Sequence, residues 1–413
     1  MKEFEKYSIF IFTTTMIGNI SNYFFQFIMG RMLDIESFGI LNSFVSMYVI
    51  LSIPATVVMV VASRHVSEYK SNGIAINSFL KSLLFYTFIF SLLYILLGIM
   101  LSGLITSYIK FNNIILVTIL VISTGISILL SVASGGLQGK KEFFAFGIVG
   151  LIFPLTRLFG GILFVYFGFR LYGVILSFLI GNIFSIIIGL LLIRKDLRNS
   201  FENNKKTKFR IELRTIKYAF TVFFVNIGMA ILLNIDIIFV KRFFSSEATG
   251  FYSVASILGK TILYISSSLV LVMFPFATEA SVKNNYAGNI LIKTLSYGGG
   301  LSLIFAIVLN IFTKQAITIL FGKKYLEAKI YIMPISFWII SLSLITIISN
   351  YSLAVDQAKQ LSFSLIVGCI LSFIFVYFFH ANILHIIYVL AIISFVVLFF
   401  NILSLSTKNF VHR

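Results

Sequence analysis

The sequence predicts an all-α membrane protein with twelve transmembrane helices, arranged as two six-helix lobes around a central cavity. Three observations predict this fold: the composition, the recurrence of long apolar runs, and an internal repeat. Hydrophobic residues make up 59% of the chain and charged residues only 11%, whereas soluble domains carry roughly 25% charged residues. Such a chain cannot cover itself with a polar surface, which excludes a soluble enzyme.

Apolar runs recur along the whole chain, and about 18 residues of this kind suffice to cross a bilayer. The polar segment 194–217 separates them into two groups of six. We therefore expect an N-terminal lobe over 1–193, a basic cytoplasmic connector over 194–217 and a C-terminal lobe over 218–413. The expected spans are 8–29, 38–62, 79–101, 114–134, 146–167, 173–193, 218–240, 251–276, 290–312, 330–351, 361–379 and 384–404.

The basic residues predict the orientation. The net charge of +18 would suggest nucleic acid in a soluble protein, but these residues lie mainly in short loops, so the anionic membrane surface is the expected partner. Their bias toward one side places both termini in the cytoplasm, with the first span acting as an uncleaved insertion signal. One loop opposes this bias, because Lys314, Lys323, Lys324 and Lys329 would face outward.

An internal repeat supports the two-lobe division. The same three residue types recur at the same spacing after the first and seventh expected spans: Arg31, Glu36 and Gly39, then Arg242, Glu247 and Gly250. Because each group holds an even number of spans, the two lobes would be parallel repeats around an axis along the membrane normal. Such pairs of bundles are typical of transporters that rock between two open states.

No constellation of catalytic residues is visible. The histidines, His65, His380, His385 and His412, lack metal-ligand spacing, and Cys369 is the single cysteine, so no intrachain disulfide forms. No Walker A loop is present, which argues against direct use of ATP. We expect no catalytic residue, no metal site and no cofactor.

The informative residues are charges inside the spans, where an ionised side chain costs roughly 2.5–3.5 kcal/mol. Arg157 lies near the middle of the fifth span and Lys260 lies within the eighth. Asp236, in the seventh span, is the one acid away from the end of an apolar run. The membrane interior thus holds more positive than negative charge, and a cavity of that sign suits an anion.

Each of these residues also has a purely structural interpretation. Lys260 and Asp236 lie at comparable depths on adjacent spans, so they would form an ion pair, which is compatible with a place in the cavity. Arg157 either lines the cavity or packs against backbone carbonyls freed by Pro154.

Residues nearer the span ends are weaker candidates. Arg31 either snorkels to lipid headgroups or clamps its loop as the repeat suggests, and Arg64 either anchors the span or contributes to binding a lipid phosphate. Uncharged polar residues on the first span of each lobe either line the cavity or bond between helices: Asn19, Asn22, Asn226 and Asn234.

Several segments resemble a known family. Residues 30–41 (GRMLDIESFGIL) resemble the first loop of polysaccharide-export flippases, and residues 320–325 (LFGKKY) resemble the segment before their tenth span. Residues 234–241 (NIDIIFVK), with 249–255 (TGFYSVA) and 273–275 (MFP), resemble their seventh and eighth spans. The chain is similar to the oligosaccharide-flippase branch of the multidrug/oligosaccharidyl-lipid/polysaccharide exporter superfamily, typified by Wzx-type O-antigen flippases.

The resemblance implies a non-enzymatic function in the bacterial inner membrane. It implies transport of an undecaprenyl-pyrophosphate-linked sugar repeat unit to the outer leaflet by alternating access, driven by a proton or sodium gradient, with a polysaccharide polymerase as a further partner. The matching cavity cations are Arg157 and Lys260, with Asp236 as a coupling or pairing acid.

Three alternative functions fit the sequence less well. A multidrug cation exporter of the same superfamily would bind its substrate through acids within spans, and the N-terminal lobe has no mid-span acid. A flippase for the peptidoglycan lipid precursor usually carries two further spans. A membrane glycosyltransferase or polymerase would need a long extracytoplasmic loop or an acidic catalytic motif, and neither is visible.

Overall fold

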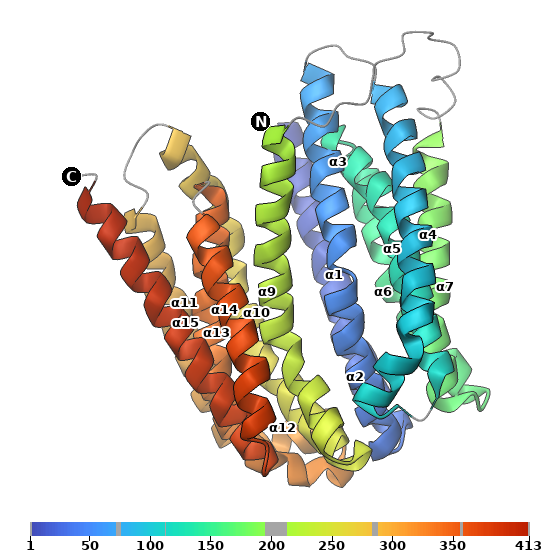
Figure 1. Cartoon of the computed structure of the whole chain (residues 1–413), viewed down its shortest axis with the longest axis vertical. Coiled ribbons are helices and arrows are strands. Elements are labelled where there is room, and N and C mark those ends of the chain that lie inside the picture. Colours follow the sequence, from blue (N-terminus) through green and yellow to red (C-terminus); the bar gives the residue numbers. More distant parts are fainter. Residues whose placement is uncertain are drawn as a thin grey trace. The chain divides into compact units, whose positions relative to one another are not determined.

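A computed structural model describes residues 2–71, 76–111, 113–194, 213–282, 288–355 and 358–411. Over these ranges the chain is helical and contains no strand, which confirms the predicted all-α membrane fold (Figure 1). His412 and most of the predicted connector, 194–217, lie outside the described residues. The chain divides into two compact units, Met1–Asp34 with Leu51–Ala219 and Ile35–Ile50 with Phe220–Arg413.

The first unit is built around one central helix. Its α5 packs against α3, α4 and α7, while α6 packs against α1 and α7. Apolar side chains of α3, α4 and α5, among them Ala62, Leu80 and Val132, form a buried core. The helices are α1 (Lys2–Met32), α3 (Ile53–Ser71), α4 (Ile76–Ile109), α5 (Ile114–Gly139), α6 (Phe143–Tyr166) and α7 (Arg170–Leu192).

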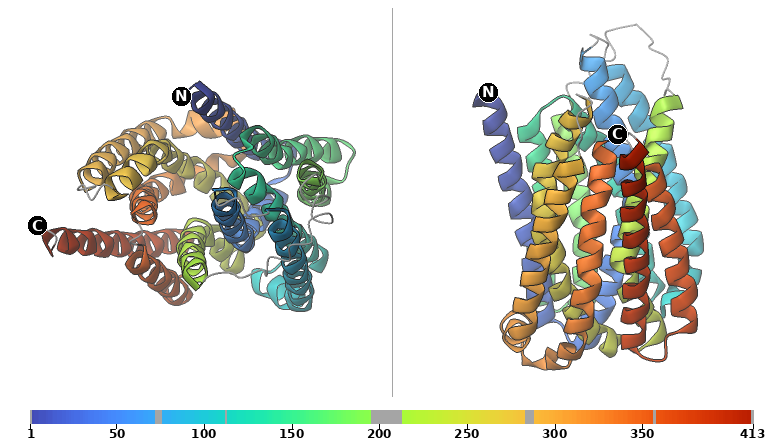
Figure 2. Two further views of the ribbon diagram at one scale, coloured as in Figure 1. Left: turned by 90° about the horizontal axis from the view of Figure 1, so that it is seen from above. Right: turned by 90° about the vertical axis from the view of Figure 1, so that its left-hand side faces the viewer.

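In the second unit α13 packs against α10, α11 and α15, and α14 packs against α15. Within each unit the long helices run side by side (Figure 2). The elements are α2 (Ile35–Leu51), α9 (Leu213–Phe243), α10 (Ser246–Val282), α11 (Gly288–Ile311), α12 (Thr313–Leu320), the 3-10 helix η2 (Lys323–Ala328), α13 (Lys329–Ala354), α14 (Lys359–Phe378) and α15 (Ile383–Val411).

Ten helices in the described part of the chain are long and apolar enough to span a bilayer. They leave large apolar side chains such as Met100 and Phe378 on the surface, where hydrocarbon is the favourable solvent. The two remaining predicted spans, 8–29 and 251–276, coincide with α1 and α10, helices of 31 and 37 residues that are not among the ten. The protein is therefore a multi-pass membrane protein, while the number of twelve spans stays a prediction.

The second predicted span, 38–62, is interrupted. Helix α2 ends at Leu51 and α3 begins at Ile53, with a short bond from the Ala55 amide to the Ser52 carbonyl (3.0 Å). Pro54 contributes to the break because it has no amide hydrogen to donate to the preceding turn. Although the predicted lobe 1–193 includes this region, the upstream part, Ile35–Ile50, groups with the second unit and α3 groups with the first.

The two glycines of the internal repeat pack directly against each other. A Cβ atom added to Gly39 on α2 would lie 2.2 Å from the Ser246 carbonyl oxygen and 2.7 Å from the Gly250 amide nitrogen. A Cβ atom added to Gly250 on α10 would lie 2.2 Å from the Ile35 carbonyl oxygen. Backbone atoms cannot rotate away as side-chain ends can, so only glycine allows this close approach of helices.

Three aromatic side chains of the second unit pack together next to the contact of Gly39 with Gly250. The Phe38 ring of α2 lies 5.9 Å from the Phe321 ring and 5.6 Å from the Tyr325 ring, and all three side chains are fully buried. Between the latter two, Gly322 has φ of 101°, a conformation that side chains with a Cβ rarely adopt. This explains the LFGKKY segment, in which glycine makes the turn and the aromatic residues anchor it.

We expect Gly39→Ala to destabilise the protein, by about 1–3 kcal/mol as for overpacked cores, because its methyl group would overlap the Ser246 carbonyl. The measurement is the thermal unfolding midpoint in detergent. Gly300→Ala on α11 is the matched control, since a Cβ there meets nothing within 4 Å. Equal midpoints for both variants would contradict the tight crossing.

Candidate functional site

A fully buried carboxylate of the second unit accepts three side-chain hydrogen bonds. Asp236 on α9 accepts hydrogen bonds from Tyr252 Oη (3.1 Å), Ser256 Oγ (2.6 Å) and Lys260 Nζ (3.3 Å). The three donors are spaced at i, i+4 and i+8 on α10, which places them on one face of that helix. We call these four residues the Asp236 cluster.

The ion pair predicted for Lys260 and Asp236 is present, with the ammonium nitrogen 3.3 Å from Asp236 Oδ1. The lysine side chain keeps 16% of its surface accessible, whereas the aspartate has none. A buried charge left without its partner costs about 3–5 kcal/mol, so the pair explains why an acid persists in the middle of an apolar helix. Because only the lysine is accessible, an incoming group would contact Lys260 before Asp236.

Sequence reasoning missed Tyr252 and Ser256 as partners of the acid. The available signal was their spacing from Lys260, because polar residues at every fourth position of an apolar helix share one face. The ring of Tyr331 on α13 packs edge-on against Tyr252, with centroids 5.9 Å apart. The cluster is therefore held by three helices of the second unit.

Arg157, in the middle of α6, lies in an aromatic cage of the first unit. Its guanidinium carbon is 4.3 Å from the Phe25 ring centre, 4.9 Å from that of Phe178 and 5.4 Å from that of Phe153. Its Nη2 donates a 2.6 Å hydrogen bond to Asn22 Oδ1. Cation–π contacts and an amide oxygen orient the guanidinium without cancelling its charge.

In the described contacts Arg157 packs on aromatic rings and an amide, while packing against carbonyls freed by Pro154 stays a prediction. Only 6% of its surface is accessible, so lining of a cavity by Arg157 itself stays a prediction. Its partner Asn22 is exposed, as are Asn19 and Thr15 on the same helix. Positions 15, 19 and 22 share one face of α1, so we call them the α1 polar stripe.

The two candidate asparagines of α9, Asn226 and Asn234, bond within their own helix. The amide nitrogen of Asn226 donates to the Val222 carbonyl (2.8 Å), and that of Asn234 donates to the Ala230 carbonyl (2.9 Å). Both side chains are half-buried. These bonds do not connect helices, and a place in the cavity stays a prediction for both residues.

The other two arginines among the predicted site residues, Arg31 and Arg64, lie toward helix ends. Arg64 on α3 forms an i,i+4 ion pair with Glu68, Nε to Oε1 at 3.1 Å, and both side chains are partly exposed. Arg31 is exposed in the last turn of α1. Partly exposed pairs of this kind contribute little stability, and a role in substrate binding stays a prediction for both arginines.

The structure thus brings together two sets of predicted residues, Arg157 with Asn22 in the first unit and Lys260 with Asp236 in the second. Among the described residues no group of three or more His, Cys, Asp or Glu side chains could hold a metal ion.

Removing one charge of the Asp236 cluster should destabilise the protein more than removing both. We expect Lys260→Met to lower the thermal unfolding midpoint in detergent, because it leaves Asp236 buried without its counter-ion. The double variant Asp236→Asn with Lys260→Met should recover part of that loss. A double variant that is no more stable than Lys260→Met alone would rule out the ion pair as the reason.

The fold is shared with transporters of known structure. A multidrug resistance transporter in an inward-facing conformation superposes with a TM-score of 0.75, at 11% identity, over 95% of this chain and 94% of that one. The lipid II flippase MurJ, in an inward closed conformation, gives 0.71 at 14% identity, over 97% and 87%. A transporter from Pyrococcus furiosus whose binding pocket is described as having reverse polarity gives 0.60 at 13% identity, over 97% and 93%.

At these identities the likeness concerns the fold alone. No curated protein matches the chain in sequence. A family model described as "Polysaccharide biosynthesis protein" matches residues 4–281, which include the α1 polar stripe, Arg157 and the whole Asp236 cluster. The chain belongs to this polysaccharide biosynthesis family.

Proposed function

We propose that the protein is a flippase that moves an undecaprenyl-pyrophosphate-linked oligosaccharide from the inner to the outer leaflet of the bacterial cytoplasmic membrane. The family match supports a place in polysaccharide biosynthesis, and the flipped repeat unit would be used by a polymerase for O-antigen or capsule. The excess of basic residues on one side supports cytoplasmic termini.

The observation that carries this proposal is the positive charge held within the apolar helices. Arg157 lies in the middle of α6, where its aromatic cage and Asn22 orient the guanidinium but leave its charge in place. Lys260 adds a second cation on α10. A pyrophosphate group would be attracted to such positions, because ionic interactions are strong where water is scarce.

The α1 polar stripe supports a water-filled path beside Arg157. Exposed amides such as Asn19 and Asn22 are unfavourable against hydrocarbon, where nothing bonds to them. We therefore place this face of α1 on the transport cavity, where Asn22 would meet the cargo first. A phosphate oxygen that replaced Asn22 as acceptor would form a charge-assisted hydrogen bond with Arg157.

The Asp236 cluster supplies a means of coupling transport to an ion gradient. A proton that binds Asp236 neutralises the carboxylate and removes the attraction that holds Lys260 beside it. The released ammonium group keeps its charge and binds the cargo phosphate. A sodium ion that displaced Lys260 from the carboxylate would have the same effect.

The multidrug transporters that share the fold suggest a second function, export of organic cations. The Asp236 cluster disfavours it, because the acid is fully buried and already bonded to a lysine and two hydroxyl groups. A cationic drug would have to displace that lysine and would meet its charge. The structural likeness to MurJ supports a lipid-linked cargo in general and leaves its sugars open.

We expect Arg157→Met and Lys260→Met each to reduce surface polysaccharide by roughly tenfold or more, since a hydrogen bond to a charged group contributes about 1.5–3 kcal/mol. The measurement is immunoblotting of the polymer in a deletion strain that expresses each variant, with membrane levels of the protein measured in parallel. The lipid-linked repeat unit should then accumulate in the inner leaflet.

The control is Lys81→Met, which removes an exposed lysine from α4 of the first unit and should leave the polymer unchanged. Normal polymer in both test variants would contradict the cationic path. Repeat units that accumulate unpolymerised in the outer leaflet would instead indicate a polymerase.

A further inference from the structure

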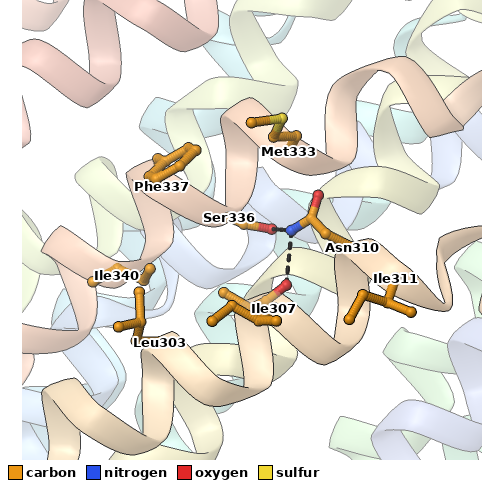
Figure 3. Close-up of a pocket in the computed structure, with 9 residues that line it drawn as sticks. Leu303, Ile307, Asn310, Ile311, Met333, Ser336, Phe337 and Ile340 are labelled. Atoms are coloured by element: carbon orange, nitrogen blue, oxygen red, sulfur yellow. Dashed lines mark hydrogen bonds between the residues drawn. The ribbon is translucent and has the colours of Figure 1, made fainter.

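A groove on the second unit runs between α11 and α13. It has a volume of about 360 Å³, within the range of roughly 300–1,000 Å³ typical of ligand sites. Figure 3 shows its lining, in which one polar pair, Asn310 and Ser336, lies among apolar side chains. The apolar lining is Leu303, Ala306, Ile307, Ile311, Met333, Phe337 and Ile340.

The rim of the groove is open. The Ile311 and Met333 side chains on its two sides are 66% and 60% accessible, while Ser336 at its base is buried. Both rim residues belong to helices long and apolar enough to cross the membrane. The groove therefore opens toward the acyl chains of the bilayer lipids. A flexible apolar chain is the occupant that fits a groove of this kind.

Exposed lysines stand at one end of the groove. Lys329 begins α13 and precedes Met333 by four residues and Ser336 by seven, so it continues the face of α13 that lines the groove. Lys314 follows Ile311 by three residues, in α12. Both lysine side chains are exposed, and Figure 1 places α12 at this end of the unit.

The charge at this end is positive overall. Lys323 and Lys324 in η2 are also exposed, and Glu327 is the one acid between α11 and α13. These are the lysines of the loop that opposes the orientation predicted from the basic residues. Binding of an anionic headgroup would explain why these lysines lie in this loop, whereas the bias of basic residues toward the cytoplasm does not explain it.

Asn310 adds a polar contact within the groove. Its amide nitrogen donates to the Ala306 carbonyl (2.8 Å) and to Ser336 Oγ (3.1 Å). The amide oxygen points away from these two bonds (Figure 3). It is placed to accept a hydrogen bond from a hydroxyl group of a lipid headgroup or glycerol backbone.

We propose that this groove binds an acyl chain of an anionic phospholipid, whose phosphate group is held at the groove's end by Lys314 and Lys329. The charge complementarity selects an anionic over a zwitterionic headgroup, and each lysine near a membrane surface contributes on the order of fivefold to such binding. The site is separate from the Asp236 cluster and does not rest on the proposed cargo.

The test measures lipid retention by native mass spectrometry of the purified full-length protein, after exchange into detergent with phosphatidylglycerol or phosphatidylcholine. The wild type should retain phosphatidylglycerol preferentially, and the double variant Lys314→Gln with Lys329→Gln should retain about 25-fold less, since each lysine contributes on the order of fivefold. The double variant Lys293→Gln with Lys359→Gln, which removes two exposed lysines at the starts of α11 and α14, should behave as wild type.

A second pair of variants tests the groove itself. Ile307→Trp places a large side chain in the groove and should reduce retention of phosphatidylglycerol, whereas Ile304→Trp on the exposed surface of the same helix should not. Unfolding midpoints confirm that each variant is folded. Equal losses in the two lysine variants, equal retention of the two lipids by the wild type, or full retention by Ile307→Trp would overturn the proposal.

Discussion

The hydrocarbon layer tolerates a charged side chain only where other groups of the protein stabilise it, and this constraint shapes both polar centres of the molecule. In the second unit Asp236 is fully buried because Tyr252, Ser256 and Lys260 donate hydrogen bonds to it. In the first unit Arg157 is held by an amide oxygen and by aromatic rings. At one centre an acid and a lysine form an ion pair, and at the other an amide and aromatic rings orient a guanidinium group.

This difference assigns different roles to the two centres in the proposed transport cycle. In the proposed cycle Lys260 would leave Asp236 to bind the cargo, and this exchange of partners would couple the second unit to an ion gradient. Arg157 would keep its charge throughout that cycle and supply a constant attraction for the proposed cargo. The helices provide the rigid frame, and the glycine contact of Gly39 with Gly250 fixes α2 on the second unit although α3 groups with the first.

Much of the fold could be predicted from the sequence, because long apolar runs have few alternatives to a membrane helix. The repeat identified Gly39 and Gly250 as special, but spacing alone did not show that the two glycines contact each other. The break at Ser52 was missed for a similar reason. An apolar run shows no change in composition where a helix is interrupted, and Pro54 alone did not distinguish a kink from a break.

The candidate site was predictable only in part. Lys260 and Asp236 were recognisable as partners because both are charged and lie at similar depth. Tyr252 and Ser256 were missed, since hydroxyl groups are common on membrane helices that bury no charge. The cage of Arg157 was not predicted, because Phe25 and Phe178 come from two other helices, α1 and α7. Long-range packing of this kind leaves no local pattern.

The most direct test is transport by the purified protein in liposomes. A tagged undecaprenyl-pyrophosphate-linked oligosaccharide is placed in one leaflet, and its appearance in the other is followed with a membrane-impermeant reagent. The account predicts transfer faster than in protein-free liposomes, dependent on an ion gradient, and slowed when the pyrophosphate is replaced by a neutral linkage. Transfer at the protein-free rate, or equal transfer of charged and neutral lipids, would contradict it.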